Sequence, residues 1–247
     1  FSEKIFAKVR HRIGLSMIAD ICSMHILLIG ATNLELDAFD QLLSNKSKHK
    51  NQVSMAVTGV GLLSTTYSLM RIINKGRPDL ILQAGIAGCF HKDQEGSVVV
   101  IREEIIADQG VLENNQFRDI FDLGLAQKNE MPFSNGRLPN PYQKLLKYTG
   151  LAAVTGISIN EISTDTERIG LYQQSFNPFV ESMEGAALHY VCIEERIPFL
   201  QMRAISNFIG ERNKEKWQMK TAFKALHHEL EMLIDKLILE DENFFGV

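Results

Sequence analysis

Short apolar runs alternate with helical patterns along most of the chain. The runs typical of buried strands are HILLIG (25–30), 53–61, 79–88, 97–108, 151–156, 179–183 and 197–207. Apolar residues recur at helical spacing in 34–44, 62–76, 184–196 and 217–239. Strands that alternate with helices predict an α/β fold of three αβα layers, in which helices cover both faces of a mixed, mostly parallel central sheet.

One segment departs from this alternation. Residues 109–148 are polar, with LENNQFRD and PFSNGRLPNP, and we expect a surface excursion rather than core. The chain shows no internal repeat, low-complexity tract or dividing linker, so residues 24–247 are predicted to form a single domain. Residues 1–23 lack the apolar core and the small-residue cleavage site of a secretory signal, and we expect an N-terminal extension outside the functional domain.

The composition narrows the class of protein. The net charge of −4 argues against nucleic-acid and anionic-membrane partners, which usually attract a basic excess. No apolar run reaches the roughly 18 residues that a membrane span needs. Cys22, Cys89 and Cys192 lack CxxC spacing and are expected to be free buried thiols in a reducing compartment. We therefore expect a cytoplasmic protein that holds no metal.

Candidate site residues follow the apolar runs, because ligands of open α/β sheets bind at the carboxyl ends of the strands. They are Glu35, the glycine turns 59–61 and 85–88 (with Gly85 and Gly88), Met183–Glu184 and Ser206–Asn207. The glycine turns alone are more typical of tight strand-to-helix connections. GVGLLS lacks the third glycine of the dinucleotide fingerprint and no GxxxxGK[ST] is present, so neither NAD nor ATP is expected and no cofactor is predicted.

Three charged residues at these positions each permit two interpretations. Glu184, where a strand gives way to a helix, suits either a helix cap or a carboxylate that accepts hydrogen bonds from a sugar diol. Arg203 lies in an apolar strand and must be paired, either structurally or in order to organise Glu184, Glu35 or an attacking water. Glu35 is either a site residue or part of the polar face of the first helix.

The motifs GATNLEL, TGVGLLS, LQAGIAG, ESMEGAA and PFLQMRAISN occur in the order and spacing of the purine nucleoside phosphorylase and nucleosidase superfamily, which the chain resembles over residues 25–237. Within it, the chain is most similar to the futalosine hydrolases and next to the methylthioadenosine/S-adenosylhomocysteine nucleosidases. The resemblance implies a homodimeric α/β hydrolase that cleaves the N-ribosidic bond of a small purine nucleoside. For futalosine, the products are hypoxanthine and dehypoxanthine futalosine, in menaquinone biosynthesis.

The resemblance also implies roles for individual residues. Glu35 falls on the glutamate that orients the attacking water, and Arg203 on the arginine of the same site. Met183 and Glu184 fall on the pair that packs against the ribose and hydrogen-bonds it. Asn207 takes the place of the aspartic acid that protonates N7 in adenine-acting relatives.

Other residues near these motifs leave alternatives open. Trp217 matches an aromatic residue that closes over the ligand but equally suits a core anchor of the last helix, and Phe208 suits either the core or the base site. His189 is more typical of a surface or core histidine. Three basic residues are candidates to bind the carboxylate of futalosine's tail, although solvated loop positions are the commoner interpretation for each: Arg118, Arg137 and Arg212.

Asn207 indicates which purine base the site accepts. A 6-oxopurine presents two acceptors, N7 and O6, whereas adenine presents an acceptor and a donor. An amide nitrogen carries two N–H donors and cannot act as an acid, so it favours a hypoxanthine-like base that is stabilised by hydrogen bonds as it departs.

Water is the expected nucleophile. The loop GATNLELD has no basic residue that could bind phosphate. It carries Glu35 and Asp37 instead, and their negative charge would repel a phosphate ion. One departure concerns the water: Ile86 stands where the nucleosidases have a serine. The alternatives are another purine nucleosidase or phosphorylase, acting on inosine, methylthioadenosine or S-adenosylhomocysteine, or a non-catalytic nucleoside-binding module. A partner copy is expected to complete the 5′ side near residues 109–120.

Overall fold

A computed structural model describes residues 24–37, 39, 52–114, 116–211 and 213–240. The predicted extension 1–23, Cys22, Arg212 and part of the predicted helix 34–44 lie outside these residues. The strands are β1 (His25–Gly30), β2 (Gln52–Val57), β3 (Leu80–Cys89), β4 (Val98–Ile106), β5 (Gly110–Glu113), β6 (Gln116–Asp119), β7 (Leu138–Pro139), β8 (Ala152–Ser158), β9 (Val180–Ser182) and β10 (Phe199–Phe208). The helices are α3 (Leu62–Lys75), α4 (Gln143–Tyr148), α5 (Thr166–Phe176), α6 (Gly185–Glu194), the 3-10 turn η1 (Lys214–Lys216) and α7 (Met219–Ile238).

The central sheet is mixed and mostly parallel, which confirms the predicted α/β fold. Its order is β10-β4-β8-β9-β3-β1-β2, with β7 added to β4. In addition, β10 pairs with β3 in parallel, and β3 pairs with β9 antiparallel. The strands β3, β10, β4, β8 and β9 therefore close on themselves, and β1 and β2 extend the sheet from β3. The closure brings the ends of β9 and β10 to either side of the end of β3.

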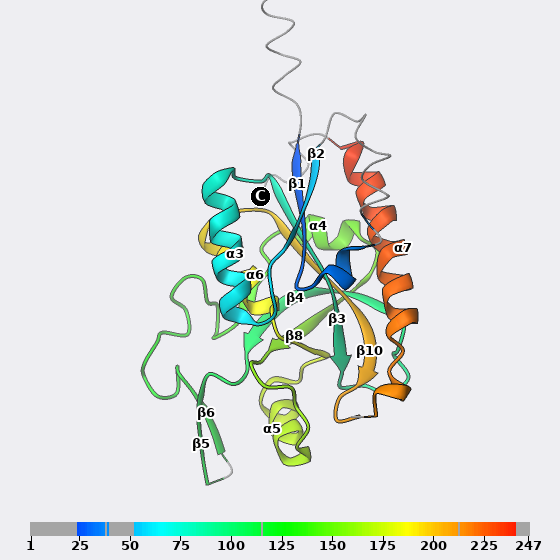
Figure 1. Ribbon diagram of the computed structural model, residues 1–247. Helices are drawn as coiled ribbons and strands as arrows, with labels where there is room; N and C mark the ends of the chain where they lie inside the picture. Colours follow the sequence, from blue (N-terminus) through cyan, green and yellow to red (C-terminus); the bar gives the residue numbers. More distant parts are fainter. Residues whose placement is uncertain (1–23, 38, 40–51, 115, 212, 241–247) are drawn as a thin grey trace, which may run out of the picture.

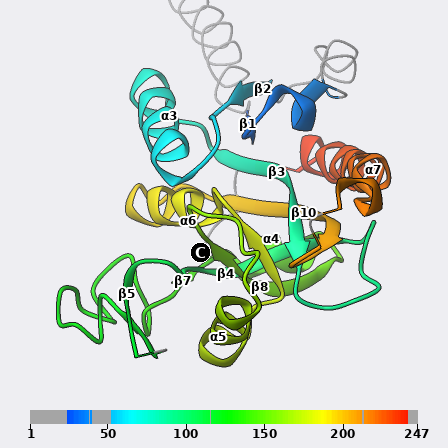
Figure 2. The same ribbon diagram turned by 60° about the horizontal axis from the view of Figure 1, so that its bottom comes forward.

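Helices cover both faces of the sheet (Figures 1 and 2). Because strand side chains alternate between faces, β1 divides its apolar residues between two clusters. Ile26 and Leu28 pack with α7, and Leu27 and Ile29 pack with α3 and α6. Helix α7 lies on the opposite side of the sheet from α3 and α6 in both views, so the three predicted layers are present.

The polar segment 109–148 is only partly the predicted excursion. Its first part forms the β5–β6 hairpin, which projects from the body of the molecule (Figure 1). Its end returns to the core: β7 pairs with β4, and α4 buries Leu145 and Leu146. The expectation of a surface segment is therefore wrong for residues 138–148. Because β7 and α4 are short and carry few apolar residues, the sequence pattern did not reveal them.

Helix α5 was absent from the sequence pattern altogether. Tyr172 is the one fully buried residue of α5, and Ile169 and Phe176, on the same face of the helix, pack partly buried on the same apolar cluster. Asp165 caps its first turn by accepting a hydrogen bond from the Arg168 backbone N–H at 2.9 Å. Its start is thus determined by capping rather than by burial.

Two further expectations concern the described part of the chain. Cys89 and Cys192 are free and buried, as predicted. No helix among the described residues is both long enough and apolar enough to cross a bilayer.

Candidate active site

A cavity of about 250 Å³ lies where β1, β3, β9 and β10 end. Its lining comes from the segments after these strands, from the loop before α5 and from the turn before α7. The predicted site residues that line it are Glu35, Gly88, Met183, Glu184, Asn207 and Trp217. The carboxyl ends of the strands thus bring together residues that are far apart in the sequence, as expected for this class of sheet.

Glu184 is held by two contacts at the edge of the cavity. Its Oε1 accepts a hydrogen bond from the Gly61 backbone N–H at 3.3 Å, and its Oε2 lies 3.4 Å from Arg203 Nη1. Glu184 occupies the N-cap position of α6 but makes no side-chain capping bond. The side chain thus does not cap the helix, and the carboxylate is buried in the cavity wall with only 5% of the residue exposed.

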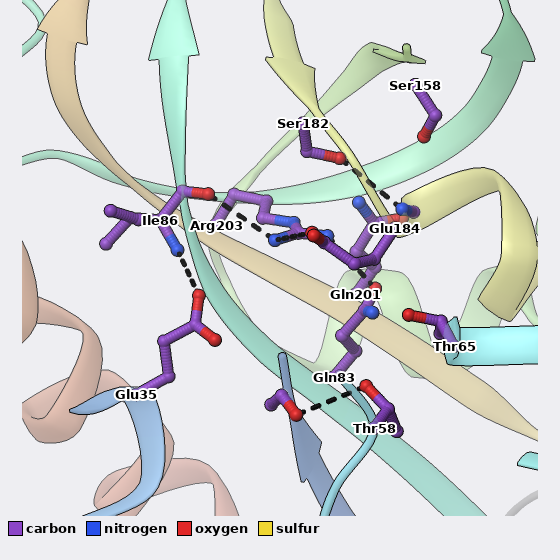
Figure 3. Close-up of polar contacts among 12 residues, drawn as sticks. Glu35, Thr58, Thr65, Gln83, Ile86, Ser158, Ser182, Glu184, Gln201 and Arg203 are labelled. Carbon is purple, nitrogen blue, oxygen red and sulfur yellow. Dashed lines mark hydrogen bonds and ion pairs between the residues drawn. The ribbon is translucent and has the colours of Figure 1, made fainter. Parts of the chain in front are cut away.

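Arg203 lies behind the cavity wall (Figure 3). It is 1% exposed and is not among the residues that line the cavity. Its guanidinium also donates to Gln83 Oε1 at 3.3 Å and to the Ile86 carbonyl at 3.4 Å. A buried guanidinium needs such partners. Of the partners expected for Arg203, the structure gives it Glu184, and the guanidinium does not reach the cavity.

Gly85 makes room for this ion pair. A Cβ at Gly85 would overlap Arg203 Nη1 and would lie 3.1 Å from Glu35 Oε1. The first glycine of GIAG is thus required by a close approach of charged side chains and not by a turn.

Glu35 lies in the helical residues 33–37 that follow β1. Its Oε2 accepts from the Thr32 backbone N–H at 3.0 Å, and its Oε1 accepts from the Ile86 N–H at 3.4 Å (Figure 3). Burial raises the pKa of this carboxyl, and the positive charge of Arg203 opposes the shift. The Ile86 backbone N–H is thus one of the donors that hold the Glu35 carboxyl group.

A β-bulge determines where Asn207 points. In the β3–β10 register, Ile205 pairs with Ala87 and Asn207 pairs with Gly88, so Ser206 is the extra residue. Bulges redirect side chains and are common beside active sites. Without the bulge, Ser206 would face Gly88 in place of Asn207.

The Asn207 amide is oriented by its neighbours. Its Oδ1 accepts from the Ser206 hydroxyl at 2.8 Å, and its Nδ2 donates to the Phe208 carbonyl at 3.0 Å. One of the two N–H bonds is therefore already used, which corrects the expectation that both are available to the base. The remaining N–H is on Nδ2, which would lie 3.5 Å from a Cβ at Gly88, another residue of the cavity lining.

The two candidate aromatic residues lie in different places, and only one of them lines the cavity. Trp217 lines the cavity, and its indole N–H donates to the Glu211 carbonyl at 2.9 Å. Phe208 is not among the lining residues; it lies on a second depression beside α5, with Lys92 Nζ 5.8 Å from its ring centroid.

The remaining candidates lie away from the cavity. His189 is fully buried, and its Nδ1 lies 2.8 Å from the Leu138 carbonyl; burial lowers the pKa of this imidazole to about 3. The core interpretation of His189 is confirmed. Arg118 is exposed, and Arg137 pairs with Glu103 at 2.7 Å. Neither arginine lines the cavity.

Two buried glutamates were not predicted. Glu181 lines the cavity from β9 and is 7% exposed. Glu104 lies fully buried under the start of α6, where it accepts hydrogen bonds from Gln201 Nε2 at 2.8 Å and from the Ser158 hydroxyl at 3.0 Å. Burial raises the pKa of Glu104 to about 7. The only sequence signal was a charged residue inside an apolar strand pattern, in ESMEG and VVVIREEII.

The arrangement offers acid–base groups and hydrogen-bond donors but no metal ligands. Within the described ranges, no three histidine, cysteine, aspartate or glutamate side chains gather as a metal site would require. The cavity combines a carboxyl with a raised pKa, Glu35, with a second carboxylate and an amide donor. Such a set suits positioning of a water and stabilisation of a departing group.

Comparisons with known proteins agree with the fold. The chain matches the family model described as the phosphorylase superfamily over residues 39–239. A futalosine hydrolase of Thermus thermophilus is 26% identical over 181 residues, 72% of this chain and 79% of that protein. A 5′-methylthioadenosine/S-adenosylhomocysteine nucleosidase of Lysinibacillus sphaericus is 24% identical over 211 residues, 77% of this chain and 89% of that protein.

The fold is shared with solved structures. The native structure of futalosine hydrolase of Helicobacter pylori has a TM-score of 0.70 and 18% identity, over 86% of this chain and 98% of that chain. The family match covers most of the residues that form the sheet and the cavity. This chain belongs to the phosphorylase superfamily.

Proposed function

We propose that the protein is an N-glycosyl hydrolase that cleaves futalosine into hypoxanthine and dehypoxanthine futalosine, a step of menaquinone biosynthesis. The observation that carries the proposal is the amide of Asn207 in the cavity lining, whose nitrogen keeps one N–H beyond the bond to the Phe208 carbonyl. A neutral donor stabilises the electron density that a 6-oxopurine gains as it leaves, without proton transfer. The sequence relatives named futalosine hydrolases support the same substrate.

Water is the nucleophile that the site favours. Glu35 lines the cavity and its carboxyl has a raised pKa, so it suits a base that takes a proton from water. The water oxygen forms a bond to the anomeric carbon, the bond from that carbon to N9 breaks, and its electron pair leaves with the base. The proton that Glu35 accepts is passed to solvent, and the base takes one up, so one water is consumed. Glu184 adds a second negative charge that disfavours phosphate.

Glu184 and Met183 provide the ribose site. A carboxylate fixed by Gly61 and Arg203 keeps lone pairs for the ribose hydroxyls, and Met183 offers an apolar surface beside it. Arg203 acts through Glu184, since it does not reach the cavity.

A second copy of the chain is the proposed partner. Large apolar side chains are exposed near the cavity, on the helical residues 33–37, the turn before α3 and α3 itself: Leu34 (67%), Val60 (53%), Leu63 (84%) and Tyr67 (63%). Exposed apolar patches of this kind mark interaction surfaces, and Val60 also lines the cavity. By contrast, no described residue of the hairpin 110–119 lines the cavity. Light scattering that finds only monomers would contradict the dimer.

The proposal is tested by chromatography of the free base. The protein is incubated with futalosine, inosine and methylthioadenosine, with and without phosphate. We expect hypoxanthine from futalosine at a rate that phosphate does not change, and a Glu35→Gln variant that releases at least tenfold less. Strict phosphate dependence would refute the hydrolase, and faster release of adenine than of hypoxanthine would favour the methylthioadenosine nucleosidase alternative.

A further inference from the structure

A buried carboxyl group, that of Glu104, lies beneath the first turn of α6. Its Oε1 accepts a hydrogen bond from Gln201 Nε2 at 2.8 Å, and its Oε2 accepts one from the Ser158 hydroxyl at 3.0 Å. The Ser158 oxygen in turn accepts from the Ala186 backbone N–H at 2.8 Å, in the first turn of the helix. Glu104 is thus linked by hydrogen bonds to the turn that begins directly after Glu184.

Two glycines make room for this carboxyl group. A Cβ at Gly185, the first residue of α6, or at Gly156 of β8 would collide with the Glu104 carboxyl group. Any side chain at position 185 would therefore separate Glu104 from the helix. The glycine that follows Glu184 is needed for this close approach, which brings a second acidic group up to the ribose site from behind.

The same carboxyl group lies near the ion pair that holds Glu184. Gln201 and Arg203 are two residues apart on β10, so their side chains point to the same face of the sheet. Gln201, Arg203 and Glu184 lie together in Figure 3. Arg203 contacts Glu184 at 3.4 Å, and its positive charge also lowers the pKa of Glu104 against the larger effect of burial. One guanidinium therefore acts on two buried carboxyl groups, one in the cavity wall and one behind it.

The other elements around Glu104 add little charge. The strands β7 and β8, which flank β4, carry no charged residue. On α6, burial lowers the pKa of His189 to about 3, so this imidazole is neutral near pH 7. Glu103, the next residue along β4, pairs with Arg137 at 2.7 Å. The ion pair behind the cavity is therefore the charged group with which Glu104 interacts.

We infer that Glu104 is a positioning residue for the ribose site: while it carries a proton, Arg203 is left to Glu184, and when it ionises, the two carboxylates compete for one guanidinium. The inference rests on the proposed function, because it assumes that Glu184 binds a ribose. A charged Glu104 repels Glu184 in surroundings that screen weakly, so the carboxylate is no longer held in place for the ribose hydroxyls. Burial raises the pKa of Glu104 to about 7, and both forms are therefore populated near neutral pH. Nucleoside binding should weaken as pH rises through 7.

The variant Glu104→Gln keeps the shape of the protonated form at every pH. Its Oε1 accepts from Gln201 and its NH₂ group donates to the Ser158 oxygen, as the protonated carboxyl group does. The probe is formycin B, a C-nucleoside whose ribose is joined through carbon to a hypoxanthine-like base, so that it cannot be hydrolysed. Free hypoxanthine is the matched ligand without ribose. Glu103→Gln is the control variant, since Glu103 is a half-buried glutamate outside the cavity.

The readout is the dissociation constant at pH 6 and pH 8, measured by titration calorimetry. If only the protonated form binds ribose, the constant for formycin B rises about tenfold between these pH values, in inverse proportion to the protonated fraction of a group with a pKa of about 7. We expect this rise in the wild type and in Glu103→Gln, and its loss in Glu104→Gln. The constant for hypoxanthine should depend on pH in the same way in all three proteins.

Several results would overturn the inference. They are a folded Glu104→Gln protein that keeps the wild-type rise, a Glu103→Gln protein that loses it, and a Glu104→Gln protein whose hypoxanthine binding changes with pH differently from wild type. If Glu104→Gln fails to fold, the heat of wild-type binding in different buffers decides. Formycin B should take up about half a proton more than hypoxanthine at pH 7, because Glu104 is half protonated in the free protein and fully protonated in the complex. Equal proton uptake by the two ligands would overturn the inference.

Turnover of futalosine separates this inference from the proposed function. A wild type that releases no hypoxanthine, yet binds formycin B with a rise that Glu104→Gln abolishes, refutes the hydrolase and supports the role of Glu104. A wild type that cleaves futalosine but binds formycin B equally well at both pH values supports the hydrolase and overturns the inference. Failure to bind formycin B at either pH would overturn the ribose site and the inference together.

Discussion

The buried carboxyl of Glu104 should make the stability of this protein depend on pH. Glu104 is fully buried beneath α6, and a Cβ at Gly156 or Gly185 would collide with its carboxyl group. The variant Glu104→Gln keeps the shape and removes the ionisable group. Its amide still accepts from Gln201 Nε2 and donates to the Ser158 hydroxyl oxygen, so we expect the packing to be preserved.

The magnitude follows from the shift in pKa. Burial raises the pKa of Glu104 from 4.5 to about 7, so the folded protein holds the proton more tightly than the unfolded chain. The stability that this group contributes is fully present below pH 4.5 and is lost as pH rises through 7. At ~1.36 kcal/mol for each pH unit, the full loss is about 3 kcal/mol. The glutamine variant cannot lose it.

The assay is urea unfolding of both proteins between pH 5 and 8.5. We expect the free energy of unfolding of Glu104→Gln to exceed that of wild type by an amount that grows with pH and approaches about 3 kcal/mol at the alkaline end. Glu161→Gln is the control, because the Glu161 side chain is 82% exposed, and its difference from wild type should stay flat. A Glu104→Gln difference that does not change with pH would refute the reasoning.

Three further predictions concern the cavity and its wall. Asn207→Asp should lower hypoxanthine release from futalosine by about 10²- to 10³-fold at pH 8, since the amide donor is lost, and should raise adenine release from methylthioadenosine relative to it. Chromatography of the free bases measures both rates. An unchanged ratio of hypoxanthine to adenine release, or the same change in the exposed control Asn135→Asp, would contradict the prediction. Arg203→Met should destabilise the fold by about 3–5 kcal/mol in urea unfolding because it leaves Glu184 buried without a cation, and adding Glu184→Gln should recover part of that loss; strictly additive losses would show that the pair does not interact. Gly85→Ala should destabilise by about 1–3 kcal/mol by displacing Arg203, whereas Gly76→Ala, with open space at its Cβ, should not; equal melting temperatures would contradict this.

The sequence was sufficient for the elements that carry strong apolar patterns. HILLIG is β1 over the predicted residues, and the predicted last helix differs from α7 by a few residues at its start. Motif order placed Glu35 and Asn207 at one end of the sheet, because the strands that precede them, β1 and β10, both run parallel to β3. Glu184 reaches the same end although β9, which precedes it, is antiparallel to β3. Helix α5 was missed because its inner face is short and mostly only partly buried, with three residues, Ile169, Tyr172 and Phe176, among polar neighbours.

What the sequence could not supply is pairing between side chains. The choice of Glu184 over Glu35 as the partner of Arg203 depends on a distance of 3.4 Å across three strands. The place of Glu181 in the cavity lining depends on the closure of the sheet, which puts β9 and β10 on either side of Gly88. Neither is encoded in the spacing of residues along the chain.

The bulge at Ser206 gives strand pairing a part in the choice of base. If β10 continued past Ile205 with every residue paired, Ser206 would face Gly88 and Asn207 would pair with Cys89, on the opposite face of the sheet. The cavity would then change its chemistry although none of its residue types had been replaced. The pairing of β10 with β3 therefore matters to the base as much as the residue at position 207 itself.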